Sequence, residues 1–481
     1  MKLSDDSCYR ALTARDRRFD GLFFVGVSTT GIYCRPVCPA RTPRRDRCRF
    51  FVAAAAAEQA GFRPCLRCRP ELAPGYAPLD SGSRRAHEIA FRIDRGALDD
   101  GGSLEALASE FGMSSRQLRR VVEAEYGVTP VQLAQTRRLL LAKQMLTETR
   151  LPIINVAFAS GFASVRRFNA LFRSSYRLAP SRLRKLSDQP ANGPSLQLTL
   201  CYVPPLAWGR MLKFLEDRAI AGVEAVEENA YLRTAFIGNH RGWLRVEPVA
   251  NEHALRVEIS ASLTPVLSKV LARLRNLFDL DARPEMIAEH LGSDVRLAPL
   301  VRREPGLRVP GSFDPFEISW RAVLGQQVSV RAATTLAGRV AQQFGESIET
   351  PVFALNRLSP SATRIAASET TEIAQLGIVR SRAATLFELA RCAGRNGWTD
   401  KTPSQPVGPV DDLLKIRGIG PWTAGYIAMR AFHWPDAFPN GDLALRKALK
   451  VTSAQALRSR AEGWRPWRAY AAMHLWNALS P

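Results

Sequence analysis

Long apolar runs are missing from this sequence, and so is a balance between acidic and basic side chains. No apolar stretch among its 481 residues approaches the ~18 that a membrane-spanning helix needs. The start, MKLSDDSCYRALTARDRRFD, is too polar for a secretory signal. We therefore expect a cytoplasmic protein with no membrane partner, whose eight cysteines serve as metal ligands or reactive thiols rather than in disulfides.

Negative charge is scarce throughout the chain. It carries 67 Lys and Arg against 45 Asp and Glu, a net charge of 67 − 45 = +22. Residues 1–190 hold 32 against 18 (+14), and residues 191–481 hold 35 against 27 (+8). Solubility alone needs far less charge, whereas a polyanionic partner accounts for it, and in the cytosol that indicates nucleic acid. Because both portions are basic, both are expected to contact this partner.

Two stretches rich in proline, glycine and small polar residues break the chain, RPELAPGYAPLDSGS and SDQPANGPS. The length alone predicts three or more domains. Alternation in SLQLTLCYV and HALRVEISASL predicts antiparallel strands, and a helical pattern follows from about residue 265. We predict a multidomain α+β protein with pieces at 1–78, 83–186 and 196–481, the last divided into a β-rich part (196–300) and an α-helical part (301–481).

The middle piece contains an internal repeat. LASEFGMSSRQLRRVVEAEYGVTP, from Leu107, matches VAFASGFASVRRFNALFRSSYRLAP, from Val156, with one inserted residue. Each copy predicts a short helix, a turn at glycine and an arginine-bearing helix, which is helix-turn-helix spacing. The positions expected to face the core are Leu104, Leu107 and Phe111, then Ile154, Ala157 and Phe158. The second helices carry Arg116, Arg119 and Arg120, then Arg166, Arg167 and Arg173.

Four cysteines form two close pairs with the spacing C-x3-C-x26-C-x2-C: Cys34, Cys38, Cys65 and Cys68. Two such pairs supply the four soft ligands of a tetrahedral site, so one Zn2+ is expected. The usual alternative is a closed site without chemistry. Arginines crowd the loop after the first pair more than a metal site requires, and they suit a phosphate backbone. Zinc keeps thiolates deprotonated, and a thiolate can take a methyl group from a DNA phosphotriester.

The segments RDRRFDGLFFVGVSTTGIYCRPVC and GFRPCLRCRP resemble the Ada-type methylphosphotriester-repair domain over about residues 4–75. The resemblance implies that Cys34 is both zinc ligand and methyl acceptor, with the other three clustered cysteines completing the ligand set. The residues that it implies contact DNA phosphates are Thr30, Arg35 and Arg41. Pro39 stands where the family has a further arginine, so one backbone contact is not expected.

The segment LPIINVAFASGFASVRRFNALFRSSYRLAPSRLR resembles the AraC-type helix-turn-helix. This implies a transcription activator that binds double-stranded promoter DNA and works with RNA polymerase. The DNA contacts are expected on the second helices, above all at Arg116, Arg166 and Arg167. A basic helix face with no partner is the alternative for either copy alone. Methylation of Cys34 removes a negative charge, and our hypothesis is that this strengthens binding to the operator.

Three further features lie close together near the C-terminus. LLKIRGIGPWTAGYIAMRAF predicts two helices joined by a tight turn at Gly418 and Gly420, whose backbone N–H groups can grip a DNA phosphate. FPNGDLALRKAL places Asp442 at a helix start, where an aspartate is usually only a cap. EGWRPWRAYAAMHLWNAL carries three tryptophans, a residue type that is mostly core. Each pattern by itself is weak.

Together these features resemble AlkA-type DNA-3-methyladenine glycosylases of the helix-hairpin-helix superfamily, from about Gln197 onward. The resemblance implies that Asp442 is catalytic and that Trp422, Tyr426 and Trp476 line the base pocket. An alkylated purine is cationic and already a good leaving group. The site must therefore recognise a cationic ring, by cation–π attraction, and stabilise a cationic sugar, by a carboxylate, once the base has been flipped out.

The chain departs from its relatives in several places. Trp422 stands where bifunctional enzymes keep a Schiff-base lysine, so no lyase activity is expected. Gln327 replaces the leucine that wedges into the flipped-out gap, and it can hydrogen-bond the orphan base. Leu443 follows the catalytic position where an aromatic residue can stand. No PCHR element is present, so the separate O6-methylguanine transfer of full Ada proteins is not expected.

The sequence thus predicts a monomeric alkylation-response protein. It takes methyl groups from DNA phosphotriesters onto Cys34, activates repair genes, and excises alkylated purines with Asp442. The alternative is a zinc-stabilised DNA-binding regulator with a catalytically inactive glycosylase-like module. Retention of an aspartate at the position of Asp442 argues against that alternative.

Overall fold

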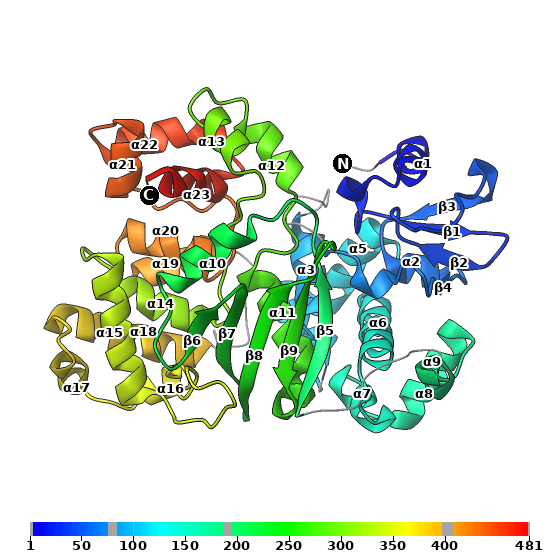
Figure 1. Cartoon of the computed structure of the whole chain (residues 1–481), viewed down its shortest axis with the longest axis horizontal. Coiled ribbons are helices and arrows are strands. Elements are labelled where there is room, and N and C mark those ends of the chain that lie inside the picture. Colours follow the sequence, from blue (N-terminus) through cyan, green and yellow to red (C-terminus); the bar gives the residue numbers. More distant parts are fainter. Residues whose placement is uncertain (1–2, 76–83, 100, 186–193, 397–406, 480–481) are drawn as a thin grey trace. The chain divides into compact units, whose positions relative to one another are not determined.

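The computed structural model describes residues 3–75, 84–99, 101–185, 194–396 and 407–479 (Figure 1). The chain forms two compact units, Met1–Pro204 with Val249–Ala272 and Pro205–Pro248 with Arg273–Pro481. The predicted boundaries at residues 78, 83 and 186 lie outside the described residues. The multidomain α+β class is confirmed. Within the described ranges, no helix combines the length and apolar content needed to cross a bilayer.

A small α/β domain opens the first unit. Its four-stranded sheet has the order β3-β1-β2-β4, with β1 antiparallel to both neighbours and β2 parallel to β4. Tyr33 pairs with Pro64 across β2 and β4, so the residues that follow them, Cys34 and Cys65, emerge side by side. The elements are α1 (Asp5–Ala14), β1 (Phe24–Val27), β2 (Ile32–Cys34), β3 (Cys48–Phe51), α2 (Ala54–Gln59) and β4 (Arg63–Pro64).

Two helix-turn-helix copies follow, as the repeat predicted. The second helices begin alike, because the side-chain oxygens of Ser114 and Ser164 each accept a hydrogen bond from the backbone N–H three residues later. They also end alike, at Gly127 and Arg177 in the left-handed region (φ 71° and 53°). The helices are α3 (Arg84–Asp94), α4 (Leu104–Glu110), α5 (Ser115–Tyr126), α6 (Pro130–Glu148), α7 (Ile153–Ala159), α8 (Val165–Tyr176) and α9 (Pro180–Lys185).

The predicted core face is right for the first copy and wrong in part for the second. Leu104, Leu107 and Phe111 are buried, and so is Ala157. Ile154 and Phe158, by contrast, are 51% and 48% exposed. The repeat offset explains this, because Leu107 aligns with Val156 rather than with its larger neighbours, and Val156 is buried. The prediction placed the bulkiest side chains of the second copy in the core, and this shifted its predicted core face by about one residue.

The predicted strands β5 (Ser195–Cys201) and β9 (Ala254–Ser260) pair antiparallel in the first unit, with β5 at the edge of its sheet. The second unit adds an antiparallel meander that sequence reasoning did not identify, formed by β6 (Glu224–Glu227), β7 (Ala230–Ile237) and β8 (His240–Pro248). Short 3-10 turns complete the chain at η1 (Arg17–Phe19), η2 (Arg45–Arg47), η3 (Pro70–Leu72), η4 (Ala261–Val266) and η5 (Glu462–Trp464).

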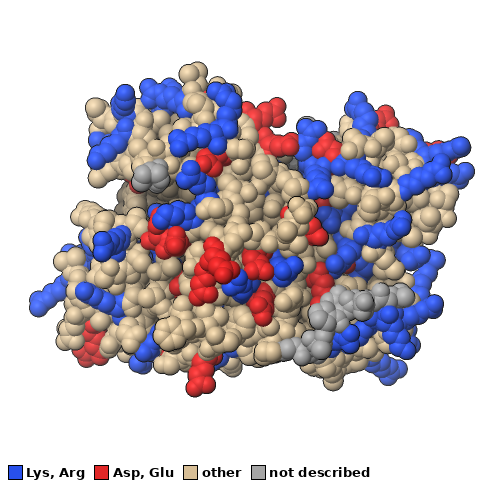
Figure 2. All heavy atoms as spheres, in the orientation of Figure 1, with Lys and Arg blue, Asp and Glu red and all other residues tan. Residues whose placement is uncertain are grey.

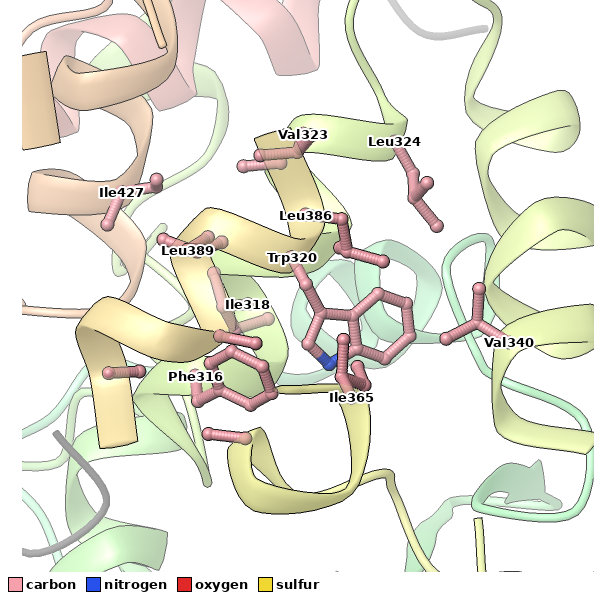
Figure 3. Packing of buried hydrophobic residues seen from close by; sticks show 14 of the residues in the cluster. Phe316, Ile318, Trp320, Val323, Leu324, Val340, Ile365, Leu386, Leu389 and Ile427 are labelled. Carbon is pink, nitrogen blue, oxygen red and sulfur yellow. The ribbon is translucent and has the colours of Figure 1, made fainter. Parts of the chain in front are cut away.

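The helical part of the second unit packs around Trp320, which is fully buried in α14 (Pro315–Leu324) (Figure 3). Phe316 and Ile318 of the same helix and Leu386 of α18 (Arg380–Asn396) lie around the indole (Figure 3). The helix is buried nearly all round because seven of the ten residues in PFEISWRAVL are apolar and the buried polar side chains, Glu317 and Ser319, are hydrogen-bonded. The hairpin helices α19 (Val407–Leu414) and α20 (Pro421–Arg430) pack against this core.

The helices of this part are α10 (Trp208–Glu216), α11 (Leu267–Leu277), α12 (Pro284–Leu291), α13 (Ala298–Arg303), α14 (Pro315–Leu324), α15 (Val330–Phe344), α16 (Ala362–Ala366), α17 (Thr370–Gln375), α18 (Arg380–Asn396), α19 (Val407–Leu414), α20 (Pro421–Arg430), α21 (Leu443–Leu449), α22 (Ala454–Ala461) and α23 (Arg468–Leu479). α11 begins in the first unit and ends in the second.

A carboxyl group lies where α2 packs on α6. Glu58 accepts hydrogen bonds from the hydroxyls of Tyr33 (3.0 Å) and Thr136 (2.9 Å). Burial raises the pKa of Glu58 to about 7, although these two hydrogen bonds act in the opposite direction. Since the unfolded chain loses this proton at the ordinary, lower pKa, the protonated carboxyl favours folding. That stabilisation is complete below the ordinary pKa and is lost as the pH rises through about 7.

We predict that Glu58→Gln makes the free energy of unfolding of the first unit less dependent on pH. In the wild type, this group should lower the free energy of unfolding by at most about 3 kcal/mol between about pH 5 and pH 8. Urea denaturation followed by circular dichroism measures the change. All nine tryptophans lie in the second unit, so their fluorescence is an internal control. An unchanged pH slope in Glu58→Gln, or the same flattening in the exposed control Glu123→Gln, would contradict the prediction.

Candidate functional site

The four predicted cysteine ligands converge in the first unit. The sulfurs of Cys34, Cys38, Cys65 and Cys68 all lie within 4.8 Å of one another, and all four residues are buried. Ligands at ~2.3 Å from one tetrahedral ion are about 3.8 Å apart, so the cluster has the right size for one metal. The β2–β4 pairing brings one cysteine from each pair together, and short turns add the others.

The donor set fits a cation such as zinc. Hydrogen bonds with the thiols of Cys38, Cys65 and Cys68, together with burial, raise the pKa of the Cys34 thiol. Four ionised sulfurs this close therefore require a compensating positive charge, and soft thiolates select zinc among common divalent ions. The backbone N–H of Arg35 donates to the Cys68 sulfur (3.3 Å), which also favours a thiolate.

Arg35 is placed differently from the phosphate contact expected for it. Its side chain is buried, with Nε 2.9 Å from Asp20 Oδ1 and Nη1 3.1 Å from the carbonyl oxygen of Cys68. A guanidinium engaged in this way orients the metal loop rather than reaching outward. Thr30 and Arg41, the other two expected contacts, are exposed. Three further arginines of the same loop are exposed as well: Arg44, Arg47 and Arg49.

The arginines of both helix-turn-helix copies face solvent. Arg116 on α5 and Arg166 and Arg167 on α8 are exposed, while the opposite faces of the two helices are buried by aligned apolar residues. Lysine and arginine side chains gather on the face shown in Figure 2, over β1, β3, α8 and α9. Both second helices therefore turn an apolar face inward and a basic face outward.

In the second unit, Asp442 lies between two indoles. Its Oδ2 accepts a hydrogen bond from Trp422 Nε1 (2.8 Å), and its Oδ1 accepts one from Trp476 Nε1 (3.1 Å). Oδ1 also accepts the backbone N–H of Leu445 (2.9 Å), so the residue is a helix cap as well. The residue is 9% exposed. Three donors from α20, α21 and α23 thus fix one carboxylate in a single orientation.

Aromatic rings continue from this carboxylate. Trp422 and Tyr426, one turn apart on α20, stack with centroids 5.5 Å apart, and Tyr426 meets Trp476 at 6.2 Å. The Tyr426 hydroxyl accepts a hydrogen bond from Arg430 Nη1 (2.8 Å). Burial raises the pKa of Tyr426, but the charges of Arg430, Arg218 and Arg321 outweigh it and lower the pKa. The contact with Arg430 thus fixes the orientation of the ring that meets both indoles.

Phe214 belongs to this wall but was not identified from the sequence. It packs in the same apolar cluster as Tyr426 and Trp476. The guanidiniums of Arg218 and Arg430 lie over its ring, 3.8 and 4.7 Å from the centroid. Phe214 comes from α10, some two hundred residues before the other members, and no local pattern distinguishes it from an ordinary core residue of an amphipathic helix.

A hydrogen bond joins the predicted hairpin turn to Gln326, the residue before the predicted wedge residue Gln327. Gly418 adopts φ +94°, and a Cβ there would lie 2.1 Å from Thr385 Oγ1, so only glycine fits. Gly420 caps α20. Gln326 donates through Nε2 to the Gly418 carbonyl oxygen (2.8 Å), and this link was not identified from the sequence. The next residue, Gln327, is exposed and has a left-handed backbone with φ +54°.

A groove of about 1000 Å³ runs beside α15. Its lining includes three arginines and several hydroxyl and amide side chains rather than the residues around Asp442: Arg218, Arg331, Arg339, Thr334, Thr335 and Gln342. Arg218 therefore contributes both to the groove and to the aromatic wall.

Three family matches cover successive parts of the chain. Residues 7–71 match the metal binding domain of Ada, residues 107–186 a helix-turn-helix domain, and residues 197–314 the AlkA N-terminal domain. DNA-3-methyladenine glycosylase 2 of Escherichia coli is 36% identical over 278 residues, which cover 58% of this chain and 96% of that protein.

A solved structure shares the fold of the C-terminal portion. The 3-methyladenine DNA glycosylase from Archaeoglobus fulgidus aligns with a TM-score of 0.52 at 21% identity, over 58% of this chain and 96% of that one. A relative from Mycobacterium tuberculosis, a probable bifunctional transcriptional activator/DNA repair enzyme AlkA, is 36% identical over 483 residues, covering 98% of this chain and 96% of its own. The chain thus belongs to the AlkA-type bifunctional transcriptional activator/DNA repair enzymes.

Proposed function

We propose that this protein binds double-stranded DNA and repairs alkylation at two sites, one of which also controls transcription. Alkylated purines of the 3-methyladenine type are excised with Asp442, and methyl groups of DNA phosphotriesters are transferred to Cys34. The observation that carries the first activity is the Asp442 carboxylate, fixed by two indole N–H groups beside a stack of aromatic rings. For the second, it is the convergence of four sulfurs.

Excision uses the residues of the second unit in sequence. The N–H groups at Gly418 and Gly420 hold a phosphate, Gln327 fills the space of the flipped-out nucleotide, and the cationic base stacks against Tyr426 and the two tryptophans. The N-glycosidic bond breaks with its electron pair leaving on the base, and a water oxygen bonds to the sugar carbon and loses a proton to the solvent. Asp442 stabilises the positive charge that develops on the sugar. With Trp422 in place of a lysine, no Schiff base forms and the strand stays intact.

Methyl transfer uses the sulfur cluster. The Cys34 thiolate attacks the methyl carbon of a phosphotriester, a sulfur–carbon bond forms, and the carbon–oxygen bond breaks with its electron pair going to the phosphate. One zinc ion, held by the four cysteines, supplies the charge that keeps them ionised. Thr30 and Arg41 hold the DNA backbone, while Arg35 positions the loop from within.

Transcriptional control follows from the charge change. Methylation converts a thiolate into a neutral thioether, so the metal site repels the DNA backbone less and the basic surface beside it binds the operator more tightly. The exposed arginines of α5 and α8, Arg116, Arg166 and Arg167, contact the operator. RNA polymerase is the partner that such an activator recruits, and the chain acts as a monomer.

The first test is release of free 3-methyladenine from alkylated DNA, measured by chromatography. We expect Asp442→Asn to lower the release rate about 10²–10³-fold, since the charge that stabilises the sugar is lost. Asp411→Asn, an exposed aspartate on α19, is the matched control and should keep the wild-type rate. No release by the wild type would instead support a DNA-binding regulator with an inactive glycosylase-like module.

The second test is mass spectrometry of the intact protein after incubation with DNA carrying methylphosphotriesters. One added methyl group should appear, and peptide mapping should place it on Cys34. Cys34→Ser should gain none, whereas Cys48→Ser, which alters a buried cysteine next to the cluster but outside the ligand set, should still gain one. If Cys34→Ser still gained operator affinity after alkylation, the proposed charge switch would be wrong.

A further inference from the structure

Glu148, the last residue of α6, accepts hydrogen bonds from all three predicted pieces of the chain, 1–78, 83–186 and 196–481. Its Oε1 accepts Arg69 Nη2 (2.7 Å) from the piece that holds the cysteine cluster. Its Oε2 accepts Gln144 Nε2 (2.9 Å) from α6 and the backbone N–H of Thr199 (3.1 Å) from β5. The Glu148 side chain is 9% exposed, and all these residues belong to the first compact unit.

The contact with Thr199 takes the place of a neighbouring strand. β5 lies at the edge of its sheet, where backbone groups that point away from β9 need partners other than a strand. Both backbone groups of Thr199 have hydrogen-bond partners on α6. Its N–H donates to Glu148, and its carbonyl oxygen accepts from Gln144 Nε2 (2.8 Å). The end of α6 thus closes the open edge of the first strand of the AlkA-type part.

Arg69 joins the same carboxylate to the cysteine cluster. It directly follows Cys68 and has a left-handed backbone, with φ +52°, which a non-glycine residue adopts only when its surroundings impose it. Two carboxylates hold its side chain, Glu148 and Glu71, the latter 3.2 Å from Nε. Glu71 is fixed in turn by an ion pair with Lys143 of α6, and both of those side chains are 1% exposed.

We propose that Glu148 couples the metal loop to the edge of β5. While Cys68 holds its ligand position, Arg69 is kept in its left-handed conformation and pins Glu148, which in turn holds the N–H of Thr199. When Cys68 leaves that position, Arg69 relaxes, the carboxylate is released, and the β5 edge opens. The coupling is reciprocal, so an ordered β5 edge also favours the metal-binding conformation of the loop. This inference goes beyond the proposed repair chemistry, because it concerns the metal loop and the strand alone.

Hydrogen–deuterium exchange of the Thr199 amide in the full chain tests the coupling, with fragmentation mass spectrometry to isolate that residue. With zinc bound, Thr199 should exchange at least about tenfold more slowly in the wild type than in Glu148→Ala, which lacks the acceptor. Chelating the metal should bring the wild type to the rate of the variant, and should leave the variant unchanged. Leu200 is the internal control, because its N–H points toward β9 and should stay slow throughout.

Two variants separate this route from general loosening of the fold. Arg69→Asn tolerates the left-handed backbone but cannot reach Glu148, so Thr199 should exchange fast both with zinc bound and after chelation. Glu123→Ala, an exposed glutamate on α5, should behave as the wild type. The proposal is overturned if Thr199 is protected in Glu148→Ala, if chelation leaves the wild type protected, or if Thr199 in Arg69→Asn stays protected with zinc bound. No alkylated DNA is used, so the result is independent of whether methyl transfer occurs.

Discussion

A charge that leaves water must find compensating partners, and each site of this protein is organised around one such requirement. Four sulfurs packed together can be ionised only around a cation. The carboxylate of Asp442 is shielded from solvent but receives three hydrogen bonds. Glu148 collects donors from three pieces of the chain. In every case the partners come from more than one element of the chain, so satisfying the charge also fixes how those elements meet.

In the proposed reactions, the two chemical sites solve opposite problems in this way. At the cysteine cluster, the chain concentrates negative charge on a sulfur that can donate electrons to a carbon. At Asp442, it concentrates negative charge on an oxygen that bonds to nothing during the reaction and only steadies a positive sugar. Aromatic rings suit the second task because their faces attract a cationic base without accepting a proton from it.

Much of this organisation could be predicted from the sequence, and the reasons differ by residue. The cysteine ligands follow from spacing, because two close pairs leave few geometries open. Asp442 and its tryptophans came from family resemblance, since a cap and three core-like indoles have no distinctive pattern of their own. Phe214 and Gln326 escaped prediction because their roles depend on contacts with residues far away in the chain. The phosphate contact of Arg35 was expected from the family resemblance, and the buried partner of its side chain, Asp20, has no local sequence signal.

Under the proposed function, Cys34 and Asp442, which lie in separate compact units, differ in how often each can react. A sulfur that has accepted carbon is spent, since nothing in the cluster offers a way to remove it. A carboxylate that never bonds to its substrate is ready again after each turnover. One molecule of this protein would therefore accept a single methyl group, which stays on the chain, and would continue to excise damaged bases afterwards.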